Sequence, residues 1–522
     1  MIPCPHPILK NKPTLDRIFI LDFGSQYTQL ICRRIRELKV YAEIIPFNTP
    51  AREILAKKPK GLILSGGPAS VTQLAAPKPD SAIFNLGIPL LGICYGMQVT
   101  AKMLGGKIGN QLREYGNARF LQTRKSPLFA RLPNRFSVWM SHGDSVHSLP
   151  PGFVKLGITG NRALAAMADE KQMIYGVQFH PEVEHTPLGR KIIANFLFRI
   201  CRCQPNWTMS NFIQEKIREI RERVGKEKIL CAVSGGVDST VLASLLYRAI
   251  GRQLIAVFVD NGLLRMGEPE QVIRTLSSRL PVKTIDARKR FLNRLARITD
   301  PEQKRRIIGA EFIRVFEEVA RNAGGIRFLA QGTLYPDLIE SRSALGGPSQ
   351  TIKTHHNVGG LPADLKFELV EPLRELFKDE VRMLGRALKL PASILNRHPF
   401  PGPGLAVRII GAVNEERLEL LRQADAIFIN ELKKSGLYNQ VWQALAVLLP
   451  VRSVGVMGDK RTYENVVALR AVTSTDAMTA DWARLPPELL ARIARRITNE
   501  VRGINRVVYD ISSKPPATIE WE

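Results

Sequence analysis

This sequence has few cysteines and no long run of apolar residues. The 522 residues include six cysteines, without zinc-type C-x-x-C spacing or a disulfide framework, so we interpret the C-R-C pair at Cys201 and Cys203 as structural. No run of about 18 or more apolar residues occurs, and the first residues lack the apolar core of a signal peptide. These absences argue against a membrane-spanning or secreted protein, and we predict a cytoplasmic one.

Acidic residues are few relative to basic ones. The chain has 48 Asp and Glu against 75 Lys and Arg, which gives a formal net charge of +27. Such an excess suggests partners that carry phosphate. The basic residues are spread along the chain, however, and neither zinc-finger spacing nor an aromatic RNA-binding signature accompanies them. We therefore do not expect nucleic acid as a partner. Nucleotide substrates fit the charge as well as a solvated basic surface does.

The chain is longer than one hydrophobic core usually supports, and its pattern divides it into three parts. Residues 16–204 and 207–397 each alternate short β-rich runs with helical stretches, which predicts a parallel sheet covered by helices. The Pro- and Gly-dense segment 398–404 allows neither a helix nor a central strand and begins the third part, 398–522. The predicted fold class is α/β, with two successive parallel-sheet α/β domains followed by a smaller α+β domain.

The motif G-x-C-x-G surrounds Cys94, at the predicted junction of a strand and a helix. A buried structural cysteine is the common alternative. A nucleophile on a sharp turn, however, needs small flanking residues, which Gly92 and Gly96 provide. The helix N-terminus would also favour a thiolate, and the backbone N–H groups of Tyr95 and its neighbours could bind an oxyanion.

A base for Cys94 is available in the sequence QFHPE. His180 and Glu182 are two residues apart, so on an extended segment their side chains share one face. Glu182 could then orient His180 as the base, and we predict a Cys94–His180–Glu182 triad. The glycines of SGGP, residues 65–68, follow another predicted strand and could supply the second half of an oxyanion hole.

A second glycine-rich loop, SGGVDST, follows an apolar strand and opens a helix. Its glycines, hydroxyls and helix N-terminus suit a phosphate, and it lacks the Walker A lysine. Asp260 ends the next predicted strand, where the base or ribose of a nucleotide would lie. The predicted ATP-binding residues are Ser234, Gly235, Gly236, Val237, Asp238, Ser239, Thr240 and Asp260.

Together these motifs resemble a known family. The first block is similar to the class I glutamine amidotransferases, and SGGVDS is similar to the loop of the PP-loop ATP pyrophosphatases. Followed by HPFPGPG, VRSVGVMGD and KPPATIEWE, they resemble the glutamine-hydrolysing GMP synthases over essentially the whole chain. The resemblance implies that Cys94 attacks glutamine, that His180 protonates the departing ammonia, and that Gly67 and Tyr95 furnish oxyanion N–H groups.

The resemblance also implies the second reaction. ATP with Mg²⁺ would adenylate the C2 oxygen of xanthosine 5′-monophosphate (XMP), and ammonia would displace AMP to give GMP. No metal ligands are assigned. The segment 341–366 lacks periodicity and is predicted to be a lid, with Lys378 approaching the phosphates, and the third domain would form a homodimer. The implied XMP contacts are Arg305, which could instead be a helix-surface charge, Gln443, Lys514 and Glu520.

Two other functions stay open at this point. A related amidating enzyme of the NAD synthetase type would share the ATP-cleaving loop, but not the C-terminal segments. A tRNA-modifying protein would use the loop to adenylate RNA and would leave the amidotransferase half unexplained.

Overall fold

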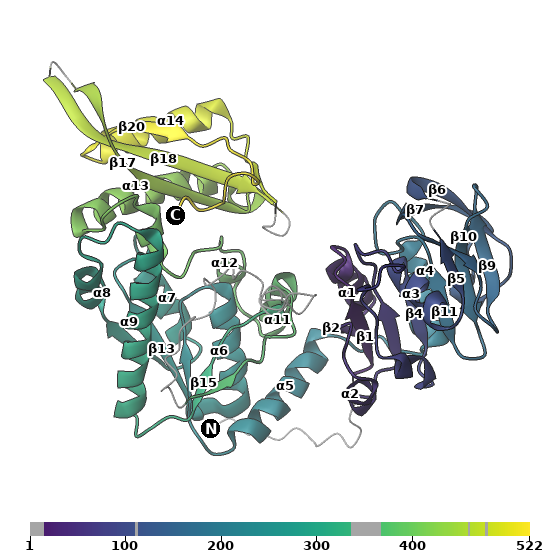
Figure 1. Ribbon diagram of the computed structural model, residues 1–522. Helices are drawn as coiled ribbons and strands as arrows, with labels where there is room; N and C mark the ends of the chain where they lie inside the picture. The colour runs from purple at the N-terminus through teal and green to yellow at the C-terminus, as the bar shows by residue number, and fades with distance from the viewer. Residues whose placement is uncertain (1–14, 110–112, 336–366, 458–459, 475–478) are drawn as a thin grey trace. The chain divides into compact units, whose positions relative to one another are not determined.

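The structure is a computed structural model that describes residues 15–109, 113–335, 367–457, 460–474 and 479–522. The described chain forms two compact units, the first ending at Phe212 and the second beginning at Ile213. Figure 1 follows the chain from the purple N-terminal strands to the yellow C-terminal helix and strand. The predicted lid, 341–366, lies outside the described residues. No helix in these ranges is long and apolar enough to cross a membrane.

The first unit is built on a nine-stranded sheet in the order β2-β1-β3-β4-β11-β10-β9-β6-β7. A small second sheet pairs β5 (Lys107–Gly109) with β8 (Ser145–Ser148). The nine strands are β1 (Arg17–Asp22), β2 (Tyr41–Pro46), β3 (Gly61–Leu64), β4 (Leu90–Ile93), β6 (Glu114–Gln122), β7 (Arg135–His142), β9 (Val154–Thr159), β10 (Leu164–Asp169) and β11 (Ile174–Val177). The helices are α1 (Thr28–Glu37), α2 (Ala51–Ala56), α3 (Tyr95–Met103) and α4 (Gly189–Asn195).

The parallel sheet predicted for this unit is one half of a mixed sheet. Strands β2, β1, β3, β4 and β11 pair in parallel, whereas β11, β10, β9, β6 and β7 pair antiparallel. The turn 170–173 between β10 and β11 is too short for the crossover that a parallel pair needs. The α/β class is confirmed, and the antiparallel half is an addition to it.

The second unit begins with a five-stranded, entirely parallel sheet in the order β14-β13-β12-β15-β16, as predicted. Its strands are β12 (Ile229–Ala232), β13 (Leu254–Asp260), β14 (Val282–Asp286), β15 (Phe328–Ala330) and β16 (Glu368–Val370). The helices are α5 (Met209–Val224), which contains the boundary between the units, α6 (Val237–Ile250), α7 (Glu268–Ser277), α8 (Arg288–Leu295), α9 (Pro301–Asn322), α11 (Lys378–Ala387) and α12 (Ala392–Leu395). The continuous apolar run in β12 is typical of a central strand with both faces covered.

The C-terminal part of this unit is an α+β layer, as predicted. Long strands β17 and β18 pair antiparallel, β19 extends the sheet, and β20 pairs with β18 in parallel. The elements are α13 (Glu415–Lys434), β17 (Gln443–Met457), β18 (Lys460–Thr473), β19 (Asp481–Trp482), α14 (Pro487–Glu500) and β20 (Ile504–Tyr509). Helix α13 starts where the Asn414 side chain accepts a hydrogen bond from the Arg417 N–H, which caps the first turn.

One continuous core joins the parallel sheet to the C-terminal layer. The same cluster of buried side chains includes Leu230 and Val257 of the parallel sheet, Phe428 of α13 and Ile493 of α14. Residues on both sides of the segment 398–404 are therefore packed together. The domain boundary at 398 stays a prediction.

Candidate active sites

Cys94 lies in the single-residue turn between β4 and α3, in a strained backbone conformation. Its φ is 52° and its ψ is −106°, a region that residues with a side chain rarely adopt. The flanking positions must be glycine because neighbouring backbone atoms leave no room for a Cβ. A Cβ on Gly96 would lie 2.2 Å from the Leu64 carbonyl oxygen, and a Cβ on Gly92 would lie 2.5 Å from the Gly96 oxygen. The geometry is that of a nucleophile elbow.

The predicted catalytic side chains come together at this turn. The Cys94 N–H donates to the Val177 carbonyl (2.8 Å), so the chain just after β11 lies beside the cysteine. His180 and Glu182 are both buried, and the His180 Nδ1 lies 2.7 Å from the Glu182 Oε1. The ring is also near enough to the Cys94 sulfur for the sulfur to raise the pKa of His180. With Nδ1 taken by Glu182, the other nitrogen, Nε2, is the one available to the sulfur.

The Glu182 carboxylate and the Cys94 sulfur favour the protonated form of His180. Burial lowers the pKa of His180, but the Glu182 carboxylate and the Cys94 sulfur raise it by more, so this pKa lies well above its usual value of 6.5. The arrangement therefore supports a protonated imidazolium beside the cysteine, held by Glu182 and able to give a proton to a leaving group.

The glycine loop 65–68 lies against the elbow. A Cβ on Gly66 would lie 3.2 Å from the His180 Cε1, and one on Gly67 would lie 3.4 Å from the Tyr95 ring and 2.8 Å from the Phe23 oxygen. The Tyr95 hydroxyl donates to the Pro77 carbonyl (2.7 Å), and burial raises the pKa of Tyr95 to about 12. Because the hydroxyl is engaged, the backbone N–H is the group of Tyr95 that suits an oxyanion.

Sequence reasoning missed Gln178, whose amide donates to the Cys94 sulfur at 3.7 Å. The same period of two that linked His180 to Glu182 also includes Gln178.

Glu182→Gln tests the role of the buried carboxylate. We expect glutamate release, measured with Mg-ATP and XMP present, to fall by about 10²-fold or more, because the amide no longer holds the imidazole in its productive protonation state. The pKa of His180 should fall as well. Retention of more than about half of the glutaminase activity would contradict this role.

The same variant has a defined effect on stability. The folded pKa of His180 is raised, so the stability from the Glu182 contact is complete below the unfolded pKa, 6.5, and is lost as pH rises through the folded pKa. Denaturant titrations of wild type and Glu182→Gln should give a difference in unfolding free energy that is largest in weak acid and smallest in strong alkali. A difference that grows with pH would contradict the assignment.

The second loop joins β12 to α6, and its conformation depends on glycine. Gly235 has a φ of 79°, and a Cβ there would lie 2.3 Å from the Val272 Cγ2 on α7. The Ser234 and Ser239 hydroxyls lie 3.0 Å apart, and the Gly236 N–H donates to the Ser234 oxygen (3.3 Å). The loop thus brings its hydroxyls and N–H groups to the N-terminus of α6, where an anion is stabilised.

Asp260 ends β13, which pairs in parallel with β12, so its carboxylate lies at the same edge of the sheet as the loop. Its Oδ1 accepts a hydrogen bond from the Gly262 N–H (3.0 Å). Sequence reasoning missed Arg397, whose guanidinium donates to the Gly235 carbonyl (2.7 Å) and to Glu268 (2.8 Å). The only sequence feature that could have pointed to Arg397 is its position just before HPFPGPG.

Of the predicted XMP contacts, the structure brings Gln443 and Glu520 together. The Gln443 Nε2 donates to the Glu520 Oε1 at 2.5 Å. The contacts of the other two lie elsewhere: Arg305 pairs with Glu302 on its own helix (2.8 Å), and the Lys514 backbone pairs with Ala480. Lys378, at the start of α11, lies 5.7 Å from the centre of the Trp442 ring, one residue before Gln443.

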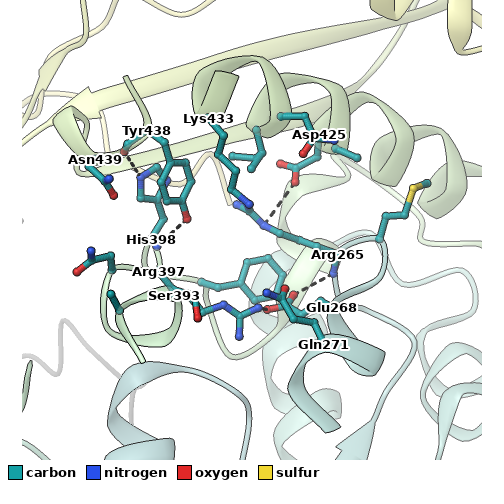
Figure 2. A pocket seen from close by; sticks show the side chains of 17 residues that line it. Arg265, Glu268, Gln271, Ser393, Arg397, His398, Asp425, Lys433, Tyr438 and Asn439 are labelled. Atoms are coloured by element: carbon teal, nitrogen blue, oxygen red, sulfur yellow. Dashed lines mark hydrogen bonds and ion pairs between the residues drawn. The ribbon is translucent and has the colours of Figure 1, made fainter. Parts of the chain in front are cut away.

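A cavity of about 490 Å³ lies between α7, α12 and α13 in the second unit (Figure 2). His398 stacks on Tyr438 in its wall, with ring centres 3.8 Å apart, and burial lowers the pKa of His398 to about 4. Arg265 pairs with Asp425 (3.4 Å), and Arg397 pairs with Glu268 (2.8 Å) in the lining. The lining combines neutral aromatic rings with paired cations, which suits a polar ligand.

In the described part of the chain, no group of three or more His, Cys, Asp or Glu side chains gathers as a metal centre would require.

Comparisons with known proteins match three parts of the chain to families. The class-I glutamine amidotransferase family matches residues 19–200, the PP-loop domain family matches 209–301, and the GMP synthase C-terminal domain family matches 430–521. The glutamine-hydrolysing GMP synthase of Thermomicrobium roseum is 60% identical over 523 residues, covering 99% of this chain and 98% of that protein. The chain belongs to the glutamine-hydrolysing GMP synthases.

Two other GMP synthases show the same full-length similarity. Those of Nitratiruptor sp. and Aquifex aeolicus are 59% and 58% identical, each covering 97% of this chain and 99% of the relative. The resemblance inferred from the sequence motifs is confirmed. Membership of the GMP synthases excludes the NAD synthetase and tRNA-modifying alternatives, and the match to the PP-loop family supports ATP as a substrate.

Proposed function

We propose that this chain makes GMP from XMP with nitrogen taken from glutamine, using two separate sites. The first carries out glutamine hydrolysis, and the second activates XMP with ATP. The observation that carries the proposal is the contact of His180 Nδ1 with Glu182 Oε1 (2.7 Å) beside Cys94. These residues lie in the first unit, whereas the loop 234–240 lies in the second. We place the activity in the cytoplasm.

At the first site, the Cys94 thiolate attacks the carboxamide carbon of glutamine, and the C–N bond breaks as the His180 imidazolium gives its proton to the leaving ammonia. Water, deprotonated by the now neutral His180, then releases glutamate from the thioester. Glu182 stabilises the imidazolium throughout. The strained elbow holds the sulfur at the helix N-terminus, and the N–H groups of Gly67 and Tyr95 bind the developing oxyanion.

At the second site, the N–H groups and hydroxyls of residues 234–240 bind the ATP phosphates. The C2 oxygen of XMP attacks the α-phosphorus, and pyrophosphate leaves. Ammonia then adds to C2, and AMP departs with the former C2 oxygen. The purine oxygen is a poor leaving group until it is joined to AMP, which explains why ATP is consumed. The final products are GMP, AMP, pyrophosphate and glutamate.

Mg²⁺ fits this site as an ion carried by the ATP phosphates. It prefers carboxylate oxygens together with phosphates and water. Asp238, in the first turn of α6, and Asp260, at the end of β13, are carboxylates at the edge of the sheet that would hold it. When bound, the ion would neutralise phosphate charge.

We also propose a homodimer formed by the C-terminal domain. Val454 and Val456 are two residues apart on β17 and so lie on the same face of the sheet. Tyr463 on β18 lies opposite Val454, and all three side chains are more than half exposed. A second copy of this sheet would cover such an apolar face. Light scattering should give the mass of two chains, and the mass of one chain at micromolar concentration would contradict the dimer.

Isotope transfer tests the chemistry of the second site. With XMP labelled by ¹⁸O at C2, Mg-ATP and ammonium, the label should appear in the phosphate of AMP, in a one-to-one ratio with GMP. Label recovered in water instead, with GMP still formed, would contradict the adenylyl intermediate. Formation of GMP without formation of AMP would contradict the proposed adenylation of XMP by ATP.

A further inference from the structure

The C-terminal tail is held by three cations whose side chains are completely buried. Lys304, Arg408 and Arg470 each have a relative exposure of 0%. A buried cation is costly unless it is paired, so these side chains fix the path of the segment that pairs with them. Their partners in the tail are, respectively, the Glu522 carboxylate (2.5 Å), the Glu520 carboxylate, and the carbonyls of Thr518 and Ile519 (2.9 Å each).

Arg408 binds Glu520 through two parallel hydrogen bonds. Its Nε lies 3.0 Å from Oε2 and its Nη2 lies 2.8 Å from Oε1. On the other side, its Nη1 lies 3.9 Å from the Asp425 carboxylate, which also accepts a hydrogen bond from the Ala446 N–H (3.2 Å). Asp425 faces the cavity and pairs there with Arg265 (Figure 2). The two parallel bonds therefore fix the guanidinium plane against Glu520, and Asp425 adds a second negative charge beside it.

This clamp determines which way the Gln443 amide faces. Both oxygens of Glu520 face guanidinium N–H groups, which can only donate, so both oxygens accept hydrogen bonds. Gln443 must therefore turn its NH₂ group to Glu520, as the 2.5 Å contact shows, and must present its Oε1 away from Glu520. Without the charge on Glu520, an amide has no such obligate orientation.

We propose that Arg408 is a positioning residue for XMP. Acting through Glu520, it fixes the Gln443 amide so that the Oε1 accepts a hydrogen bond from an N–H or O–H donor of the nucleotide. This inference rests on the proposed function, because it takes Gln443 and Glu520 as part of the XMP site. It adds a selectivity: the site favours ligands that place a donor at this point over those that place an acceptor there.

Arg408→Met and Glu520→Gln in the full chain test this role with ammonium, Mg-ATP and XMP. We expect each to raise the KM for XMP by about tenfold or more, because a charge-assisted network is lost, while the KM for ATP changes by less than about twofold. Arg408→Lys keeps the charge but not the two parallel bonds, and should recover part of the loss. A merely structural role would not separate the two KM values.

Controls make the outcomes distinct. Arg417→Met removes a guanidinium that binds the carbonyls of Ala412 and Ile410, and it should leave the KM for XMP unchanged. If Arg408→Met fails to fold, Arg408→Lys decides, because it keeps the charge and removes the two parallel bonds to Glu520. An unchanged KM for XMP in folded variants of an active enzyme overturns the inference alone. A wild-type protein that neither binds XMP in calorimetry nor makes GMP overturns the proposed function as well.

Discussion

Cys94→Ala should abolish GMP synthesis from glutamine while GMP synthesis from ammonium continues. The expected loss with glutamine is at least about 10³-fold, because removal of a nucleophile leaves only binding and oxyanion stabilisation. The ammonium reaction should stay within about threefold of wild type, since it needs the second site alone. Steady-state GMP formation with each nitrogen donor, at saturating XMP and Mg-ATP, measures both.

A second cysteine of the same unit provides the matched control. Cys201 is buried, and burial raises the pKa of its thiol, so it is a poor nucleophile. Cys201→Ala should leave both nitrogen donors active. Glutamine-dependent synthesis that survives Cys94→Ala would show that another group attacks the carboxamide.

Gly235→Ala should reduce ammonium-dependent GMP synthesis by about 10²-fold or more. At a φ of 79° a side chain adds backbone strain, of about 1 kcal/mol or more. The new Cβ would also lie 2.3 Å from the Val272 Cγ2, so the loop or α7 must move. A displaced loop no longer aims its N–H groups at the phosphates, and a shift of about 1 Å is enough to lose a rate of this size.

Gly251→Ala separates backbone strain from the clash. Gly251 also has a positive φ, 56°, but no atom lies within 4 Å of the position that a Cβ would take. This variant should lose some stability and keep its activity. Equal activities of the two variants, measured with ATP titrated to saturation, would contradict a phosphate-binding role for the loop.

The features that the sequence could predict are those set by neighbouring residues. Cys94 between two glycines, after an apolar run and before a helix, predicted the elbow. The spacing of His180 and Glu182 predicted a shared face, and the structure brings the two side chains to 2.7 Å. SGGVDST between a strand and a helix predicted the second loop, because close backbone approach and φ are local properties.

The rest depends on contacts between residues far apart in the chain. Arg408 and Glu520 are separated by 112 positions, and Lys304 and Glu522 by 218. Lys304 and Arg305 are adjacent basic residues, and no local pattern shows which of them faces inward, so the burial of Lys304 could not be predicted. The antiparallel half of the first sheet has a local cause instead, because a connection as short as the turn 170–173 allows only an antiparallel pair.

Amide-labelled glutamine tests whether the nitrogen released at the first site is the nitrogen that reaches XMP. Wild-type protein is supplied with [amide-¹⁵N]glutamine, unlabelled ammonium, Mg-ATP and XMP, and the mass of the GMP is measured. We expect GMP that carries ¹⁵N on its 2-amino group, and we expect Cys94→Ala to remove this label. GMP that contains only ¹⁴N, while labelled ammonia accumulates in solution, would contradict the claim that the two sites work together.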